Sequence, residues 1–504
     1  MITCTATVDP DAVIGPVPRR LFGSFLEHMG RAVYGGVHDP DHPTADVDGL
    51  RGDVVDLVRE LGVSVVRYPG GNFVSGYHWE DGVGPRADRP ARLDLAWHSV
   101  EPNTFGLDEF MTWSTLAGVE PMLAVNLGTR GVTAAARLLE YTNHPGGTEI
   151  SDRRRSHGRA EPYGVRLWCL GNEMDGPWQI GHKTAQEYGR LAAETAKAMR
   201  MVDPDIELVA CGSSHAGMPT FGAWERTVLD HTYEHVDYLS LHAYYRRDDA
   251  DLSGYLASAD AMDEFVKGVV ATCDQVAAEK RHKRKMLLSF DEWNVEHRSY
   301  IPADDNPGWT HAPRIVEDEY TAEDAVAVGN LLITLLRNSD RVAIACQAIL
   351  VNVIAPIRTE PGQPARRQAT YHPFALTARH ARGDVLRVDA VSDTSVETAA
   401  RGAVAPVDLI ATHDDGAITM FIVNRSSHDE VDLQVTLGTR GRHRVVEHVV
   451  IEPDHDRATA GEAALGVPVS SQAHRLTDGR VLSVRLPRAS WQMIRLGRQR
   501  VGTA

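Results

Sequence analysis

Eight short apolar runs, separated by longer segments with helical periodicity, dominate the sequence between about residues 21 and 357. Each run is nearly continuous in apolar residues, as expected for a parallel strand buried on both faces. The segment 184–202 between two of them opens on Thr184 with Glu187 three residues later, a capping-box signature of a helix start. Eight such units predict a closed (β/α)₈ barrel, with an open doubly wound sheet as the alternative. The expected strands are 21–28, 63–68, 121–127, 165–172, 206–211, 236–244, 285–292 and 342–354.

The sequence changes character after about residue 382. Segments such as GAITMFIVNRS and VDLQVTLG alternate apolar and polar residues between turn-like stretches, which predicts antiparallel strands of a β-sandwich. The N-terminal MITCTATVD is also strand-like. We therefore expect an α/β chain with a catalytic barrel at 17–382 and a β-sandwich domain formed by 1–16 together with 383–504.

The composition restricts the compartment and the partners. The formal charge of −17 repels phosphate backbones and anionic membranes, which argues against nucleic acid and membrane partners. Five cysteines, odd in number and scattered, suggest reduced thiols rather than a disulfide framework. No apolar stretch approaches the ~18 residues of a membrane span, and the first residues do not resemble a secretion signal. A cytoplasmic protein is expected.

Polar side chains stand at the carboxyl ends of the expected strands, where a (β/α)₈ barrel carries its active site. Carboxylates, amides and hydroxyls with tryptophan nearby suit a polyol ligand. The sequence shows neither a phosphate-binding glycine motif nor a zinc-type spacing of Cys and His, so we expect no cofactor and no metal. These strand-end residues, with Asn72 from the loop after the second strand, are Glu27, His28, Arg67, Asn126, Asn172, Glu173, Ser213, His242, Tyr244, Asp291, Glu292 and Asn352.

Two of these residues, Glu173 and Glu292, follow the fourth and seventh strands and would face each other across the barrel mouth. A carboxyl pair in this arrangement suits glycosidic cleavage, in which one group protonates the leaving oxygen and the other attacks or activates water. A glutamate after a strand is often only an exposed loop carboxylate. The flanking Asn172 and Asp291, together with the matching strand positions, favour the catalytic interpretation.

Five long motifs resemble the hallmarks of glycoside hydrolase family 51, the α-L-arabinofuranosidases, and the similarity covers essentially the whole chain. They are LGNEMDGPWQ, FDEWNV, RYPGGNFVSGYHWEDGVGP, LFGSFLEHMGRAVYGG and LVNVIAPI. The resemblance implies a barrel with a jelly-roll-like β-sandwich, a retaining double displacement, no metal, and a homo-oligomer, often a hexamer.

The resemblance also implies roles for individual residues. Glu173 would be the general acid/base and Glu292 the nucleophile. Asn172 would bind the sugar 2-hydroxyl, and Glu27 and Asn72 other hydroxyls. Tyr244 and Arg67 would hold Glu292. His242 could orient a catalytic carboxylate or make a structural hydrogen bond.

The chain departs from the family pattern at two positions in the expected pocket. Glu296 stands where the family usually reads an aromatic residue, in DEWNVEH instead of DEWNVW. Ile349 stands where the eighth strand usually carries glutamine, and Gln347 lies two residues earlier on the same face. These changes represent either neutral drift or a pocket adapted to β-D-galactofuranose, which carries one more exocyclic carbon than α-L-arabinofuranose.

The sequence thus predicts a retaining, exo-acting α-L-arabinofuranosidase that trims terminal residues from oligosaccharides. A β-D-galactofuranosidase on the same scaffold is the alternative. Remoter possibilities are an inactive carbohydrate-binding barrel and a metal-dependent barrel hydrolase.

Overall fold

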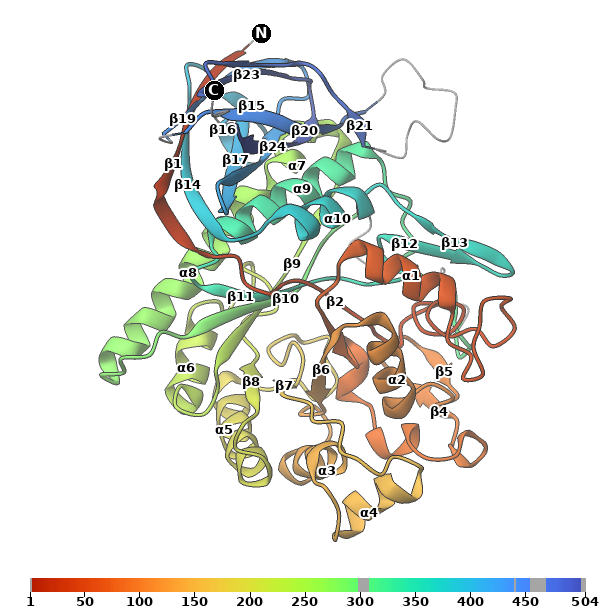
Figure 1. Cartoon of the computed structure of the whole chain (residues 1–504). Helices are drawn as coiled ribbons and strands as arrows, with labels where there is room; N and C mark the ends of the chain where they lie inside the picture. The colour runs from red at the N-terminus through yellow and green to blue at the C-terminus, as the bar shows by residue number, and fades with distance from the viewer. Residues whose placement is uncertain (1, 298–307, 439–440, 454–467, 500–504) are drawn as a thin grey trace.

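A computed structural model describes residues 2–297, 308–438, 441–453 and 468–499 of the chain. It consists of a helix-covered barrel and a large β-sheet that lies against one side of it (Figure 1). None of the helices in the described part of the chain combines the length and hydropathy that a membrane span requires.

Eight parallel strands close into a barrel in which each strand pairs with its neighbours in chain order. The last strand, β11, pairs with the first, β2, and closes the ring. This confirms the predicted (β/α)₈ architecture and excludes the open doubly wound sheet. The strands are β2 (Arg20–Phe25), β3 (Val65–Tyr68), β6 (Glu120–Val125), β7 (Leu167–Leu170), β8 (Glu207–Ala210), β9 (Tyr238–Arg246), β10 (Leu287–Glu296) and β11 (Val342–Gln347).

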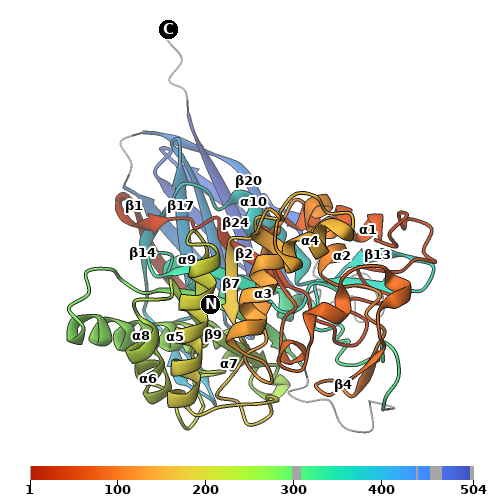
Figure 2. The same cartoon turned by 90° about the horizontal axis from the view of Figure 1, so that it is seen from below.

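Helices surround the barrel and follow each strand in turn (Figure 2). The Thr184 side chain accepts a hydrogen bond from Glu187 N, and Thr321 N donates one to the Asp324 carboxylate, so the helices after β7 and β10 begin where the sequence predicts. The main helices are α1 (Gly52–Leu61), α2 (Leu107–Ala117), α3 (Val132–Asn143), α5 (Ala185–Val202), α6 (Ala223–Thr232), α8 (Ser258–Glu279), α9 (Ala322–Arg337) and α10 (Tyr371–His380), with the shorter α4 (Glu149–Ser156) and α7 (Leu252–Leu256).

Two predicted strand ends were wrong. β10 continues to Glu296 because it keeps pairing with an equally long β9, with Asn294 opposite Tyr244. Glu292 therefore lies within a strand rather than at its end. β11 stops at Gln347 instead of 354, and the segment after it bends, with Asn352 in the left-handed region at φ 64°.

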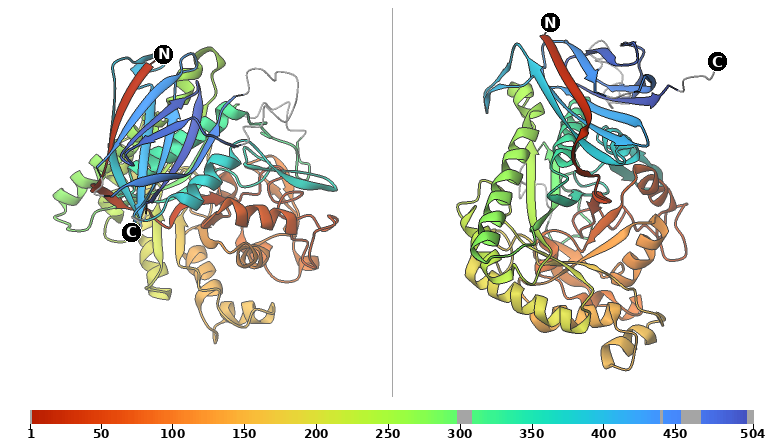
Figure 3. Two further views of the ribbon diagram at one scale, coloured as in Figure 1. Left: turned by 45° about the horizontal axis from the view of Figure 1, so that its top comes forward. Right: turned by 60° about the vertical axis from the view of Figure 1, so that its left-hand side comes forward.

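The second sheet contains ten strands from both ends of the chain. β1 runs antiparallel to β14 and parallel to β19, so the N-terminal strand lies inside the sheet (Figure 3). Its alternation buries Ile2, Cys4, Ala6 and Val8 in an apolar cluster of the sheet's own. The strands are β1 (Ile2–Pro16), β14 (Asp384–Ser392), β17 (Val407–Asp414), β18 (Ala417–Asn424), β19 (Val431–Leu437), β20 (His443–Ile451), β21 (Val469–Ser470), β22 (His474–Thr477), β23 (Val481–Leu486) and β24 (Ser490–Arg498).

The predicted sandwich-like C-terminal region is thereby confirmed, whereas the exact domain boundaries remain a prediction. Three two-stranded sheets decorate the fold. They are β4 (Arg92–Asp94) with β5 (Ser99–Glu101), β12 (Ile357–Glu360) with β13 (Gln363–Arg367), and β15 (Val396–Thr398) with β16 (Gly402–Val404).

Helix α9 joins the two parts of the molecule. A side chain at Gly329 would collide with the indole of Trp491 on β24, so glycine allows the helix to approach the sheet closely. Arg337 at the end of the helix pairs with the buried Asp408 of β17, which also binds Arg425. Apolar packing and buried ion pairs thus hold the sheet against the barrel.

Candidate active site

Glu292 is a buried carboxylate held at both of its oxygens. Its Oε1 accepts a hydrogen bond from Arg67 of β3 at 2.8 Å, and its Oε2 accepts one from the Tyr244 hydroxyl of β9 at 2.7 Å. The residue is only 4% exposed. A cation and a phenol that both donate to the carboxylate fix its orientation.

Glu173 approaches from the loop that follows β7 and is more accessible. The backbone at Glu173 is left-handed, with φ 43°, which turns the side chain away from the line of the strand. Its Oε1 lies 3.0 Å from His242 Nδ1, and its Oε2 accepts a hydrogen bond from Trp178 Nε1 at 2.7 Å. Trp178 is 47% exposed, so Glu173 lies between the buried barrel mouth and solvent.

The two glutamates lie close together. One oxygen of Glu173, one oxygen of Glu292 and a ring nitrogen of His242 are all within 4.8 Å of one another. Retaining glycosidases place their carboxyls about 5–5.5 Å apart, whereas inverting enzymes need about 6.5–9.5 Å to admit a water. The separation fits direct attack by one carboxylate on the sugar.

Further buried charged side chains, Asp291 and His242, lie next to this pair. Asp291 accepts a hydrogen bond from Ser240 at 2.5 Å and lies 3.5 Å from Arg67 Nε. Burial would raise the pKa of Asp291, but Arg67 and His242 hold it below its usual value. Burial likewise would lower the pKa of His242, yet the neighbouring Glu292, Asp291 and Glu173 raise it to about 10. At neutral pH His242 is therefore a cation between carboxylates.

Glu27 and two asparagines form the opposite side of the site. Glu27 Oε1 accepts hydrogen bonds from Phe73 N at 3.0 Å and from Trp97 Nε1 at 2.6 Å. Asn172 accepts from Arg67 at 2.5 Å and lies 3.4 Å from Asn72 Oδ1 through its own Nδ2. Arg67 thereby links the glutamate on β10 to the asparagine beside Glu173.

Two family models match this chain: the α-L-arabinofuranosidase 1 domain over residues 57–254 and the α-L-arabinofuranosidase C-terminal domain over residues 291–490. An intracellular exo-α-(1→5)-L-arabinofuranosidase from Streptomyces lividans is 54% identical, covering 98% of this chain and 75% of that protein. One from Bacillus subtilis is 50% identical, covering 98% of both. The structure of a family 51 α-L-arabinofuranosidase from Bifidobacterium longum superposes with a TM-score of 0.91 at 43% identity, covering 98% of this chain and 99% of that one.

The chain belongs to glycoside hydrolase family 51, the α-L-arabinofuranosidases. The resemblance drawn from the sequence motifs is confirmed. These comparisons give no support to the alternative of a β-D-galactofuranosidase.

The residues that depart from the family 51 pattern lie apart from the glutamate pair. Ile349 is buried in the apolar core, so the isoleucine that replaces the family's usual glutamine does not leave an open space there. Gln347 Nε2 donates to Asn294 at 3.1 Å, and among the described residues no hydrogen bond joins it to either glutamate. Glu296 is half-buried at the outer end of β10, four residues beyond Glu292. Burial and the nearby Asp318 raise its pKa to about 7.

Sequence reasoning missed two tryptophans of the family 51 site. Trp97 reaches Glu27 from the loop between β4 and β5, where no strand-end signal marks it. Trp178 lies only five residues after Glu173, in the quoted motif, and its hydrogen bond to that glutamate was not anticipated. Asn126, by contrast, is one of the predicted strand-end residues, but its role is structural. Its Nδ2 donates hydrogen bonds to the Tyr77 carbonyl and to Thr129.

A metal ion is the remaining ligand to consider within the site. The same three residues, Glu173, His242 and Glu292, offer a ligand set that could hold one. His242 would first have to lose the proton that its carboxylate neighbours stabilise. The prediction that catalysis needs no metal therefore requires a direct test.

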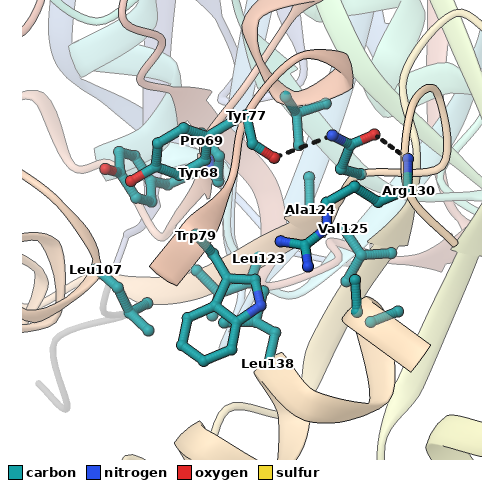
Figure 4. Close-up of a pocket in the computed structure, with 14 residues that line it drawn as sticks. Tyr68, Pro69, Tyr77, Trp79, Leu107, Leu123, Ala124, Val125, Arg130 and Leu138 are labelled. Carbon is teal, nitrogen blue, oxygen red and sulfur yellow. Dashed lines mark hydrogen bonds between the residues drawn. The ribbon is translucent and has the colours of Figure 1, made fainter. Parts of the chain in front are cut away.

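A separate cavity of about 30 Å³ lies outside the barrel wall between β3, β6 and α3 (Figure 4). It is lined mainly by apolar side chains such as Leu123 and Leu138, and neither catalytic glutamate reaches it. The buried Tyr77 hydroxyl and Trp79 Nε1 have no protein partner there. The space is sufficient for about one water molecule and far too small for a sugar.

Proposed function

We propose that this chain is a retaining, exo-acting α-L-arabinofuranosidase in which Glu292 is the nucleophile and Glu173 the general acid/base. One observation supports this assignment above the others. One oxygen of Glu173 and one of Glu292 lie within 4.8 Å of each other, with Glu292 buried and hydrogen-bonded by Arg67 and Glu173 beside an exposed tryptophan, in a member of family 51.

In the first step, a Glu292 oxygen attacks the anomeric carbon of the terminal sugar. The bond from that carbon to the glycosidic oxygen breaks, and Glu173 in its protonated form delivers a proton to the leaving oxygen. Arg67 and Tyr244 keep the attacking carboxylate oriented through their hydrogen bonds. A glycosyl ester on Glu292 and a free alcohol result.

In the second step, Glu173 as a carboxylate removes a proton from water, which attacks the same carbon and releases Glu292. Two displacements at one carbon preserve the anomeric configuration. His242 lies 3.0 Å from Glu173 and 3.6 Å from Glu292, so its positive charge positions and balances both carboxylates.

The remaining residues of the site would recognise the sugar. Asn172 and Asn72 would bind hydroxyl groups, with Asn172 on the 2-hydroxyl, and Glu27 would bind another. Trp178 lies on the outer side of Glu173, where the departing part of the substrate must leave. Glu296, Gln347 and Ile349 are further candidates for contact with the substrate, although no hydrogen bond among the described residues joins them to the glutamate pair.

The named relatives suggest the type of linkage. Several are exo-α-(1→5)-L-arabinofuranosidases, and a Bifidobacterium longum relative, 52% identical over 440 residues, is an exo-α-(1→6)-L-arabinofuranosidase. Carbon 5 of an arabinofuranose and carbon 6 of a hexose both carry primary hydroxyls. We therefore propose that arabinofuranose is released from oligosaccharides in which it is attached to a primary oxygen.

The deciding experiment is proton NMR of the first product released from an aryl α-L-arabinofuranoside. Initial appearance of the α-anomer of L-arabinofuranose supports retention, and initial appearance of the β-anomer overturns it. The absence of any turnover would favour the inactive carbohydrate-binding barrel instead. Activity that EDTA abolishes and zinc restores would contradict the metal-free mechanism.

Two further properties belong to this proposal. The relatives from Streptomyces lividans and Bacillus subtilis are named intracellular enzymes, and we propose the same cytoplasmic location here. A homo-oligomer, with a hexamer as the specific form, is also proposed, and light scattering at several protein concentrations tests it.

A further inference from the structure

Glu27 is a buried carboxyl group, and no ion pair joins it to a cation within the described part of the chain. The residue is 2% exposed, and both of its recorded hydrogen bonds, from Phe73 N and Trp97 Nε1, end on Oε1. Among the described residues, no hydrogen bond reaches its Oε2. Glu292, by contrast, accepts hydrogen bonds from Arg67 and Tyr244.

The charged groups around Glu27 are mainly anions. Glu292 of β10 and Asp94 of β4 both act on it electrostatically in the unfavourable direction. Arg67 of β3 directs its nitrogens to Glu292, Asn172 and Asp291. His28, the next residue, points its ring to Glu101 and Tyr68. Tyr244 of β9 donates its hydroxyl to Glu292.

An anion in this place would be costly. A buried carboxylate without a cationic partner normally takes up a proton, and a second carboxylate nearby strengthens that tendency. Burial first, and the charge of Glu292 next, raise the pKa of Glu27 well above its usual value of 4.5. The two N–H donors on Oε1 act in the opposite direction but leave Oε2 free to carry the proton.

The loop that follows β3 passes very close to this carboxyl group. Gly71 has φ 60°, and a side chain there would collide with both Glu27 oxygens. A glycine is therefore required for the backbone to pass so close to the carboxyl group. The group is fixed in position by its surroundings rather than by an opposite charge.

We propose that Glu27 is a neutral carboxylic acid in the resting enzyme, with its proton on Oε2, and that this O–H donates a hydrogen bond to an oxygen of the bound sugar. Glu292 can then act as the nucleophilic anion, because a neutral Glu27 does not repel its charge. The contact with sugar rests on the proposed function, whereas the protonation of Glu27 does not.

Two variants distinguish a neutral acid from a carboxylate. Glu27→Gln preserves the shape of a neutral acid, with an oxygen for Trp97 and an N–H donor toward the sugar. We expect its kcat/KM to stay within about tenfold of the wild type, the cost of one altered neutral hydrogen bond. Glu27→Ala, which removes the acceptor of the hydrogen bonds from Trp97 Nε1 and Phe73 N, should lose at least about 100-fold.

If Glu27→Gln falls as far as Glu27→Ala while its melting temperature matches the wild type, the neutral-acid proposal is overturned. A charged group would show that result, because glutamine removes a negative charge and places an N–H₂ where an acceptor is needed. Glu60→Gln, a substitution on the surface of α1, serves as the control for handling and expression.

A spectroscopic measurement tests the proton without any substrate. The infrared difference spectrum of wild type minus Glu27→Gln at neutral pH should contain the C=O stretch of a protonated carboxyl group. A difference spectrum that contains only carboxylate bands overturns the proposal. Because this readout is independent of turnover, it separates failure at Glu27 from failure of the proposed arabinofuranosidase activity.

Discussion

The two glutamates that we propose as catalytic occupy contrasting surroundings. Glu292 lies on a barrel strand, is nearly inaccessible, and has one oxygen on a guanidinium and the other on a phenol. Glu173 lies on a loop in a left-handed conformation, with its outer oxygen on an indole that is itself half-exposed. A nucleophile must be a fixed anion, whereas an acid/base must exchange protons with a leaving group and then with water. The rigid strand and the open loop correspond to these two tasks.

Removal of the buried member should have the largest effect. Glu292→Ala eliminates the attacking atom, so kcat should fall by at least about 10⁴-fold on every substrate. Steady-state rates with an aryl arabinofuranoside and an arabino-oligosaccharide measure this. A variant that keeps one percent of wild-type kcat on either substrate would remove Glu292 from the nucleophile's role.

Removal of the exposed member should depend on the substrate. Glu173→Ala should slow oligosaccharide cleavage by about 10²–10⁴-fold, because an alkoxide needs a proton to leave. The formation of the glycosyl enzyme from a dinitrophenyl arabinofuranoside should change little, and added azide should accelerate its breakdown. Equal losses for good and poor leaving groups would contradict the acid role.

A matched pair of substitutions compares the two supports directly. Tyr244→Phe and Trp178→Phe each remove one donor from a catalytic glutamate. The buried donor should matter more, with kcat reduced by about 10–100-fold for Tyr244→Phe and by less than about tenfold for Trp178→Phe. A larger loss of kcat in Trp178→Phe than in Tyr244→Phe would show that the burial of the donor does not determine its effect on the rate.

The smallest effect concerns stability at the rim of the site. The pKa of Glu296 is raised to about 7 from 4.5, so the folded state binds its proton more tightly than the unfolded state. The free energy of unfolding should therefore fall as pH rises from about 4.5 to 7. Glu296→Gln should abolish this decline and be more stable than wild type at pH 8 by about 1 kcal/mol, reduced for solvent screening. Urea unfolding at pH 4.5 and pH 8 measures it, and equal stability at pH 8 would contradict it.

The eight buried strands are nearly continuous in apolar residues, which predicts a parallel sheet covered on both faces. The number of repeating strand–helix units then favours the closed barrel over an open sheet. The sequence misplaces the ends of β10 and β11, since pairing between Asn294 and Tyr244 extends one strand and the bend around Asn352 ends the other. Those contacts join residues far apart in the chain, which local patterns do not report.

The site shows the same division. Glu173, Glu292, Arg67 and Tyr244 are predictable from strand ends and motifs, and the structure brings them together. Trp97 is not, because it comes from a loop whose position depends on the tertiary fold. The effects expected at Glu296 and Ile349 were inferred from residue type alone, and the burial of Ile349 shows why type is insufficient.

The location of β1 has a consequence for biosynthesis. Ile2–Pro16 is synthesised before the barrel, yet its neighbours in the sheet are β14 and β19, which are made more than 360 residues later. Each barrel strand pairs with the barrel strand that precedes or follows it in the chain. All eight barrel strands are synthesised before β14 and β19. The nascent chain must therefore keep an alternating apolar strand without its sheet throughout most of its synthesis.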